Sequence, residues 1–164
     1  MIARARHMFD GIIVGIGHNP EKQALFPYED RLDMAQTLIG ELVEKHPNLA
    51  PVRVEQYSGL TVDFARESGG VALLRGIRNV TDLATETQFA ITNRQVANIE
   101  TVFIVTGEAF AFTSSSLIRQ IAALGGDLGK LQSIIPPLVI SKLKAMQDDS
   151  SSPLKALVID SHME

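Results

Sequence analysis

Two arginines three positions apart, Arg75 and Arg78, are the first sign of chemistry in this sequence. They stand in Leu74-Arg75-Gly76-Ile77-Arg78, where a short apolar run ends. A glycine lets the backbone come close to a ligand, and guanidinium groups match the paired oxygens of a phosphate. The pattern therefore suits a phosphate site. Two solvated arginines in an ordinary strand-to-helix turn explain it equally well.

A run of hydroxyl residues forms a second candidate anion site. Phe110-Ala111-Phe112-Thr113-Ser114-Ser115-Ser116 precedes an apolar helix that starts near Leu117. Hydroxyls and free N–H groups at the amino end of a helix attract anions. The alternative is a plain helix cap with spare serines, and it fits the segment alone slightly better. Phe110 and Phe112 could flank a planar base, although aromatic residues beside a strand more often belong to a core.

Three further polar residues lie after or near other predicted strands. The position of each also has an ordinary structural explanation. Lys22 follows the first apolar run, Thr61 follows the second strand pattern, and Glu86 lies about one turn into a helix. Taken singly, each is typical of a solvated or capping side chain. Gly15-Ile16-Gly17-His18 looks like the end of a phosphate-binding His-x-Gly-His motif. It lacks the first histidine, so we assign no catalytic role to His18.

Alternating strand and helix patterns must position these residues. Strands are expected near residues 11–16, 52–57, 71–74 and 101–105, and helices near 2–9, 32–42, 60–67, 83–96, 117–122 and 138–146. Continuous apolar runs are typical of parallel strands that are buried on both faces. The pattern predicts an α/β fold with a doubly wound, Rossmann-like parallel sheet, in which ligands bind at the carboxyl ends of the strands. Such a domain normally opens with a strand, whereas this chain opens with a helix.

Composition narrows the class of protein. The 164 residues are 45% hydrophobic and 21% charged, with a net charge of −4 and no cysteine. We expect one domain over residues 1–146 and a mobile, serine-rich tail over 147–164. No apolar run approaches the ~18 residues that a membrane span needs, and the negative charge argues against a nucleic-acid surface. The absence of cysteine excludes disulfides and thiolate metal sites. We therefore expect a cytoplasmic protein with a small-molecule ligand.

Several segments, in order and at matching spacing, resemble the bacterial phosphopantetheine adenylyltransferases of the nucleotidyltransferase superfamily. The resemblance runs from Ala5 to about Met146. It is carried by Met8-Phe9-Asp10, by Asn19-Pro20-Glu21-Lys22, by Tyr57-Ser58-Gly59-Leu60-Thr61-Val62-Asp63-Phe64-Ala65, by Arg75-Gly76-Ile77-Arg78 and by Phe112-Thr113-Ser114-Ser115-Ser116.

The resemblance implies transfer of AMP from ATP to 4′-phosphopantetheine, which gives dephospho-coenzyme A and pyrophosphate. It implies that Lys22, Thr61 and Arg75 contact phosphopantetheine, with Lys22 and Arg78 supporting catalysis. The ATP-binding residues that it implies are Gly76, Ile77, Arg78, Glu86, Phe110, Ala111, Phe112, Thr113, Ser114, Ser115 and Ser116. It also implies Mg²⁺ as cofactor, a homohexamer and feedback by coenzyme A.

One part of the family pattern has no counterpart in the sequence. Family members open with a strand and a loop that carry a Thr/His-x-Gly-His motif, and Met1 aligns just after it. We therefore expect a shortened chain without the family's catalytic histidine, and we name no certain catalytic residue. Two alternatives stay open. The first is that the chain is a nucleotide-binding remnant without activity. The second is that it is a sister nucleotidyltransferase that uses another acceptor.

Overall fold

The computed structural model describes residues 1–18, 24–107 and 115–148 of the chain. Contacts divide the chain into two compact units, Met1–Gly107 and Glu108–Glu164. The predicted domain over residues 1–146 and the predicted tail over 147–164 stay predictions. Within the described ranges, no helix is long and apolar enough to cross a membrane.

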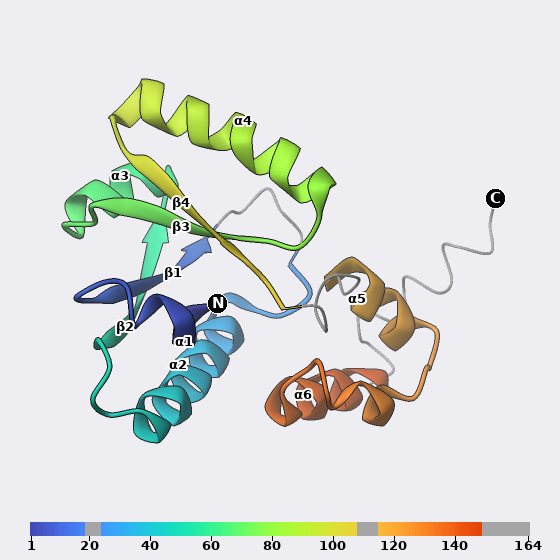
Figure 1. The fold of residues 1–164 in the computed structure, drawn as a ribbon. Helices are drawn as coiled ribbons and strands as arrows, with labels where there is room; N and C mark the ends of the chain where they lie inside the picture. The colour runs from blue at the N-terminus through green and yellow to red at the C-terminus, as the bar shows by residue number, and fades with distance from the viewer. Residues whose placement is uncertain (19–23, 108–114, 149–164) are drawn as a thin grey trace. The chain divides into compact units, whose positions relative to one another are not determined.

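The first unit alternates helices and strands as the sequence predicts (Figure 1). In chain order its elements are α1 (Ile2–Ala5), β1 (Ile12–His18), α2 (Tyr28–Lys45), β2 (Val52–Ser58), α3 (Thr61–Glu67), β3 (Ala72–Ile77), α4 (Val80–Ala97) and β4 (Glu100–Val105). The α/β fold class is confirmed. Most bounds differ from the prediction by a few residues. In particular, the first helix is shorter, and β3 runs on through Ile77, so that Arg75 and Gly76 belong to the strand.

The strands pair in parallel, but in two separate pairs. β1 pairs with β2 from Ile12 opposite Val52 to His18 opposite Ser58. β3 pairs with β4 over residues 72–77 and 100–105. Within the described residues these are two two-stranded sheets. The prediction of strands buried on both faces is wrong for β1, which has no buried residue, and for β3, which has only Ile77. Among the described residues, each of these strands pairs with a single other strand.

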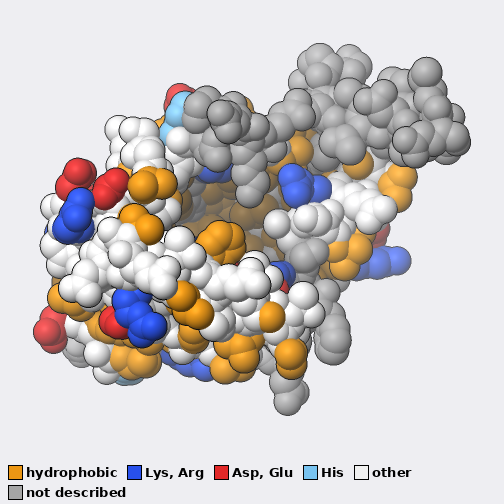
Figure 2. Space-filling view, turned by 90° about the horizontal axis from the view of Figure 1, so that it is seen from above, with side chains coloured by type: hydrophobic (Ala, Val, Ile, Leu, Met, Phe, Trp, Pro, Cys, Tyr) orange, Lys and Arg blue, Asp and Glu red, His pale blue; other side chains and the backbone are white. Residues whose placement is uncertain are grey.

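Helix α3 joins the second strand to the third and carries the core of this unit. Val62 and Ala65 are buried with Ile99, and Leu73 packs against them. Because residues three apart lie on one face of a helix, the spacing of Val62 and Ala65 turns one apolar face inward. By contrast, α4 has no buried residue over its 18 residues. Phe89 is 57% exposed, and hydrophobic side chains reach the surface on the face seen in Figure 2.

Arg6 fixes the segment after α1, and sequence reasoning missed it. Its side chain is buried, with 2% of the residue exposed. The guanidinium donates to four backbone carbonyls at and beyond the carboxyl end of α2, those of Leu42, His46, Leu49 and Ala50. The last carbonyls of a helix lack partners within the helix and carry partial negative charge. The arginine therefore satisfies groups that would otherwise be buried without hydrogen bonds.

The second unit contains α5 (Ser115–Ala123), the short 3₁₀ helix η2 (Leu128–Leu131) and α6 (Pro137–Asp148). Gly125 and Gly126 end α5: Gly125 takes a positive φ of 73°, and the Gly126 N–H donates to the Ile121 carbonyl. The helix predicted near residues 138–146 is found as α6, which begins one residue earlier and ends two residues later. The core of the unit consists of Ala122, Leu128, Ile135, Ile140 and Leu143.

Candidate functional site

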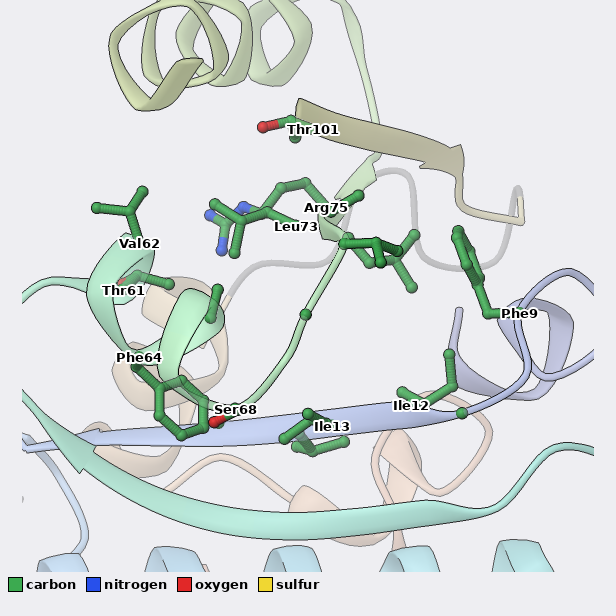
Figure 3. Close-up of a pocket in the computed structure, with 18 of the residues that line it drawn as sticks. Phe9, Ile12, Ile13, Thr61, Val62, Phe64, Ser68, Leu73, Arg75 and Thr101 are labelled. Carbon is green, nitrogen blue, oxygen red and sulfur yellow. The ribbon is translucent and has the colours of Figure 1, made fainter. Parts of the chain in front are cut away.

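The first unit holds a cavity of about 1160 Å³, and several predicted site residues border it (Figure 3). Thr61 reaches it from α3 and Arg75 from β3, while Glu86 reaches it from α4. The two residues assigned to phosphopantetheine by resemblance, Thr61 and Arg75, thus share one space with a residue assigned to ATP. This volume exceeds the ~300–1,000 Å³ that is typical of small-molecule pockets.

Arg75 is held by a two-pronged ion pair with Glu86. Its Nε and Nη2 each donate to one carboxylate oxygen at 2.7 Å. The hydrogen bond from Arg75 to Glu86 raises the pKa of the arginine and outweighs the opposing effect of burial. The Arg75 side chain remains 52% exposed, whereas that of Glu86 is 16% exposed. The carboxylate therefore fixes the guanidinium from behind and leaves much of its surface open to the cavity.

Thr61 is oriented from β2 by Tyr57. The two hydroxyls lie 2.9 Å apart, and the Tyr57 ring stacks on Phe64 with centroids 4.5 Å apart. Gly15 makes room for this stack, because a Cβ at position 15 would lie 2.7 Å from Phe64 and 3.0 Å from Tyr57. The roles of Tyr57 and Gly15 were missed. Their presence at the ends of neighbouring strand patterns is the signal that could have found them.

Arg78 lies in the turn between β3 and α4. Its side chain donates to Asp82 at 2.7 and 3.1 Å, and this bonding lowers the pKa of Asp82. Asn79 caps α4 by accepting from the Asp82 N–H at 2.9 Å. Gly76 permits a close approach, since a Cβ there would lie 3.1 Å from Met1 Sδ. The Ile77 side chain is buried, so a ligand would meet its backbone.

Only part of the serine segment, from Ser115 onward, lies within the described residues. Ser115 and Ser116 form the first turn of α5 and are exposed, and Arg119 donates to the Ser116 hydroxyl at 3.2 Å. Six predicted site residues lie outside the described residues: Lys22, Phe110, Ala111, Phe112, Thr113 and Ser114. Their roles stay predictions.

His18, which we did not assign to catalysis, ends β1 and meets Tyr28 edge to face, with ring centroids 5.2 Å apart. Arg31 lies over the same tyrosine ring and donates to the Gly17 carbonyl at 3.2 Å. Sequence reasoning missed that this arginine reaches the carboxyl end of β1.

Metal ligands are not clustered in the described part of the chain. No group of three or more His, Asp or Glu side chains there could hold an ion. The two carboxylates nearest the candidate arginines, Glu86 and Asp82, are already engaged by them. The described residues therefore offer no carboxylate cage of the kind that Ca²⁺ takes.

Parallel strands alternate with helices, and arginines lie at or near the carboxyl end of one strand, the edge at which α/β proteins bind their ligands. A model of the cytidylyltransferase-like family matches residues 1–121. The chain is 44% identical over 146 residues to the phosphopantetheine adenylyltransferase of Rhodopirellula baltica, a match that covers 88% of this chain and 78% of the relative. It is 41% identical over 145 residues to the protein of that name from Desulfosudis oleivorans, covering 88% and 80%. For the Heliobacterium modesticaldum protein of that name the values are 34% over 151 residues, 92% and 84%.

The chain therefore belongs to the cytidylyltransferase-like family, and within it to the phosphopantetheine adenylyltransferases.

Proposed function

We infer that the chain transfers the adenylyl group of ATP to 4′-phosphopantetheine, forming dephospho-coenzyme A and releasing pyrophosphate. The observation that carries this inference is the identity of 41–44% to relatives named phosphopantetheine adenylyltransferase over most of the chain. The cavity that brings Thr61 and Arg75 together supports it.

We assign binding of the acceptor, phosphopantetheine, to Arg75 and Thr61. The phosphate of phosphopantetheine binds the exposed part of the Arg75 guanidinium, which Glu86 holds in a fixed orientation. The Thr61 hydroxyl, which Tyr57 orients, forms a second hydrogen bond with phosphopantetheine. A guanidinium is well suited to this role because it pairs with phosphate oxygens and keeps its charge throughout.

We assign binding of the nucleotide to the turn from β3 to α4 in the first unit, and the resemblance alone adds Ser115 and Ser116. Arg78 and the N–H groups of the first turn of α4 would face the phosphates of ATP, since a helix amino end attracts anions. Glu86, which the resemblance assigns to ATP, acts in the described structure through Arg75. Ser115 and Ser116 would supply hydroxyls and N–H groups from the first turn of α5.

The reaction is a direct displacement. An oxygen of the acceptor's phosphate attacks the α-phosphorus of ATP and forms a new P–O bond. The bond from that phosphorus to the oxygen that bridges to the β-phosphate breaks, and pyrophosphate leaves with the electron pair. Negative charge grows on the departing oxygen and spreads over the transferred group. The work of the protein is therefore to align both phosphates and to stabilise this charge with Arg75, Arg78 and Lys22.

Further properties follow from family membership alone. Mg²⁺ is expected as cofactor. Because no carboxylate cage occurs among the described residues, phosphates and water would supply its ligands, as Mg²⁺ commonly prefers, and it would neutralise phosphate charge. We also propose a cytoplasmic homohexamer that is subject to feedback by coenzyme A.

The test is pyrophosphate release by the 164-residue chain with ATP and three acceptors in turn: 4′-phosphopantetheine, nicotinate mononucleotide and glycerol 3-phosphate. Of the three acceptors, we expect only 4′-phosphopantetheine to support pyrophosphate release from ATP. Faster release with another acceptor would assign a sister activity. Calorimetric binding of ATP and dephospho-coenzyme A with no turnover would instead assign a non-catalytic nucleotide-binding protein.

A further inference from the structure

Two glycines of β1 support the ring of Tyr57. Gly17 stands opposite Tyr57 in the register of β1 and β2. A Cβ at Gly17 would lie 3.0 Å from the Tyr57 hydroxyl, and a Cβ at Gly15 would lie 3.0 Å from a carbon of the same ring. Because residues 15 and 17 share one face of the strand, the ring lies along a track without side chains. The hydroxyl that contacts Thr61 therefore rests on Gly17, near the carboxyl end of β1.

Helix α2 holds the same end of β1 through two side chains. The helix packs against β1 and β2 (Figure 1). Tyr28 donates its hydroxyl to the Ile16 carbonyl at 3.2 Å, and Arg31 Nη1 donates to the Gly17 carbonyl at 3.2 Å. Tyr28 and Arg31 are three residues apart, which places them on one face of the helix. The backbone on which the Tyr57 hydroxyl rests is thus fixed by donors from α2.

The ring of Tyr28 orients the guanidinium of Arg31. The central carbon of the guanidinium lies 5.3 Å from the ring centroid, within the ~6 Å over which a cation is attracted to an aromatic face. His18, the last residue of β1, meets the same ring edge to face. A guanidinium is planar and rigid, so stacking on the tyrosine also sets the direction in which it donates. A lysine would keep the charge without this fixed direction.

One nitrogen of Arg31 indicates that this side chain does more than stabilise the fold. Its Nε is buried and has no hydrogen-bond partner in the described structure. A buried N–H without a partner lowers stability, and an apolar side chain of similar length would avoid that loss. What an apolar side chain cannot reproduce is the hydrogen bond to the Gly17 carbonyl.

We propose that Arg31 is a positioning residue for the acceptor site. It fixes the backbone of Gly17, Gly17 supports the Tyr57 hydroxyl, and that hydroxyl orients Thr61. The contacts run from α2 through β1 and β2 to α3, and they end at the cavity that Thr61 lines. In the described structure Arg31 does not line this cavity, so it acts through its neighbours. The inference rests on the proposed adenylyl transfer, in which Thr61 binds the acceptor.

The arrangement of the strands makes the expected effect selective. Gly17 and Tyr57 belong to the pair formed by β1 and β2, whereas Arg78 follows β3 in the other pair. A displaced Gly17 therefore disturbs Thr61 and leaves the residues assigned to the nucleotide in place. Loss of Arg31 should weaken the use of phosphopantetheine and leave the use of ATP nearly unchanged.

Steady-state kinetics of Arg31→Met tests the proposal, because methionine is unbranched and has no donor for the Gly17 carbonyl. We expect the KM for 4′-phosphopantetheine to rise at least threefold, while kcat and the KM for ATP change less than twofold. Arg31→Lys, which can still donate, should recover part of the acceptor KM. The matched control is Lys45→Met, which removes an exposed cation at the other end of α2. It should behave as the parent chain does.

A double-mutant cycle tests the route through Thr61. Thr61→Val removes the hydroxyl at the end of the contacts, so adding Arg31→Met to it should raise the acceptor KM much less than in the parent chain. The midpoint of urea unfolding should stay close to that of the parent, since Arg31→Met also removes the unpaired Nε. A full rise in both backgrounds, an equal rise in the KM for ATP, or a lower midpoint with an unchanged acceptor KM would overturn the proposal.

A readout without substrate separates this outcome from failure of the proposed function. The amide NMR signals of Tyr57 and Thr61 should shift in Arg31→Met and stay in place in Lys45→Met. If the parent chain releases no pyrophosphate, the proposed function fails, and calorimetric affinity for 4′-phosphopantetheine replaces KM in every comparison above. Unmoved Thr61 signals overturn the role of Arg31. So does an affinity that is the same in Arg31→Met as in the parent chain, including the case in which neither binds.

Discussion

The guanidinium of Arg75 on β3 and the carboxylate of Glu86 on α4 form two parallel hydrogen bonds of 2.7 Å each. Glu86 is the less exposed partner, so it acts as a support that aims the arginine into the cavity. We therefore expect Glu86→Gln to loosen Arg75 and raise the KM for phosphopantetheine several-fold, with a smaller effect on kcat. Arg75→Lys, which loses the fork that matches phosphate oxygens, should raise the same KM about tenfold or more. Steady-state kinetics with the acceptor varied at saturating ATP measures both. An unchanged acceptor KM in Arg75→Lys would remove this arginine from the site.

Tyr57 orients Thr61 through hydroxyls 2.9 Å apart. Tyr57→Phe keeps the stack on Phe64 but removes this contact, and we expect a loss of kcat/KM for phosphopantetheine of about two- to twelvefold, in keeping with a neutral hydrogen bond worth ~0.5–1.5 kcal/mol. The matched comparison is Thr61→Val, which keeps the shape of the side chain and removes its hydroxyl. A much smaller loss in Thr61→Val than in Tyr57→Phe would contradict a role for Tyr57 that acts through Thr61.

Gly15 is required by the aromatic stack beside it. In Gly15→Ala the new Cβ would lie 2.7 Å from Phe64. Overpacking of this kind typically costs ~1–3 kcal/mol, so the midpoint of urea unfolding should fall. Gly11→Ala is the matched control, because a Cβ there meets nothing within 4 Å. Equal unfolding midpoints for the two variants would show that the aromatic stack rearranges with no loss of stability.

The ion pair between Arg78 and Asp82 makes the stability of the fold depend on pH. Arg78 lowers the pKa of Asp82 from its ordinary 3.8. A carboxyl whose pKa is depressed in the folded state favours folding above its unfolded pKa, and this contribution is lost as the pH falls through the folded value. The window therefore lies below pH 3.8. NMR titration of the Asp82 carboxyl should show a higher pKa in Arg78→Gln than in the parent chain. Arg94→Gln, which alters a cation farther along α4, should leave it unmoved.

Much of the first unit could be predicted because its strands and helices follow local rules. The strands expected near residues 11–16 and 52–57 and the helix expected near 117–122 are all found, as β1, β2 and α5. Burial could not be predicted in the same way. A continuous apolar run indicates a strand that is buried on both faces, yet β1 has no buried residue and β3 has only Ile77, because burial depends on what packs over each face in the tertiary structure.

The candidate site was predicted as residue types but not as contacts. Arg75 and Glu86 were both named, whereas their ion pair joins positions eleven residues apart and appears only once β3 and α4 pack together. Arg6 was missed for a similar reason. Its partners lie 36 to 44 residues away, and nothing in its own neighbourhood marks an arginine that will be buried.

Acceptor-dependent release of pyrophosphate from ATP is the most direct measure of the proposed adenylyl transfer. With the 164-residue chain and Arg75→Lys assayed side by side, we predict release that requires 4′-phosphopantetheine and is reduced in the variant at low acceptor concentration. Faster release with nicotinate mononucleotide or glycerol 3-phosphate would contradict the account. So would the absence of release by a folded chain that binds both ATP and dephospho-coenzyme A.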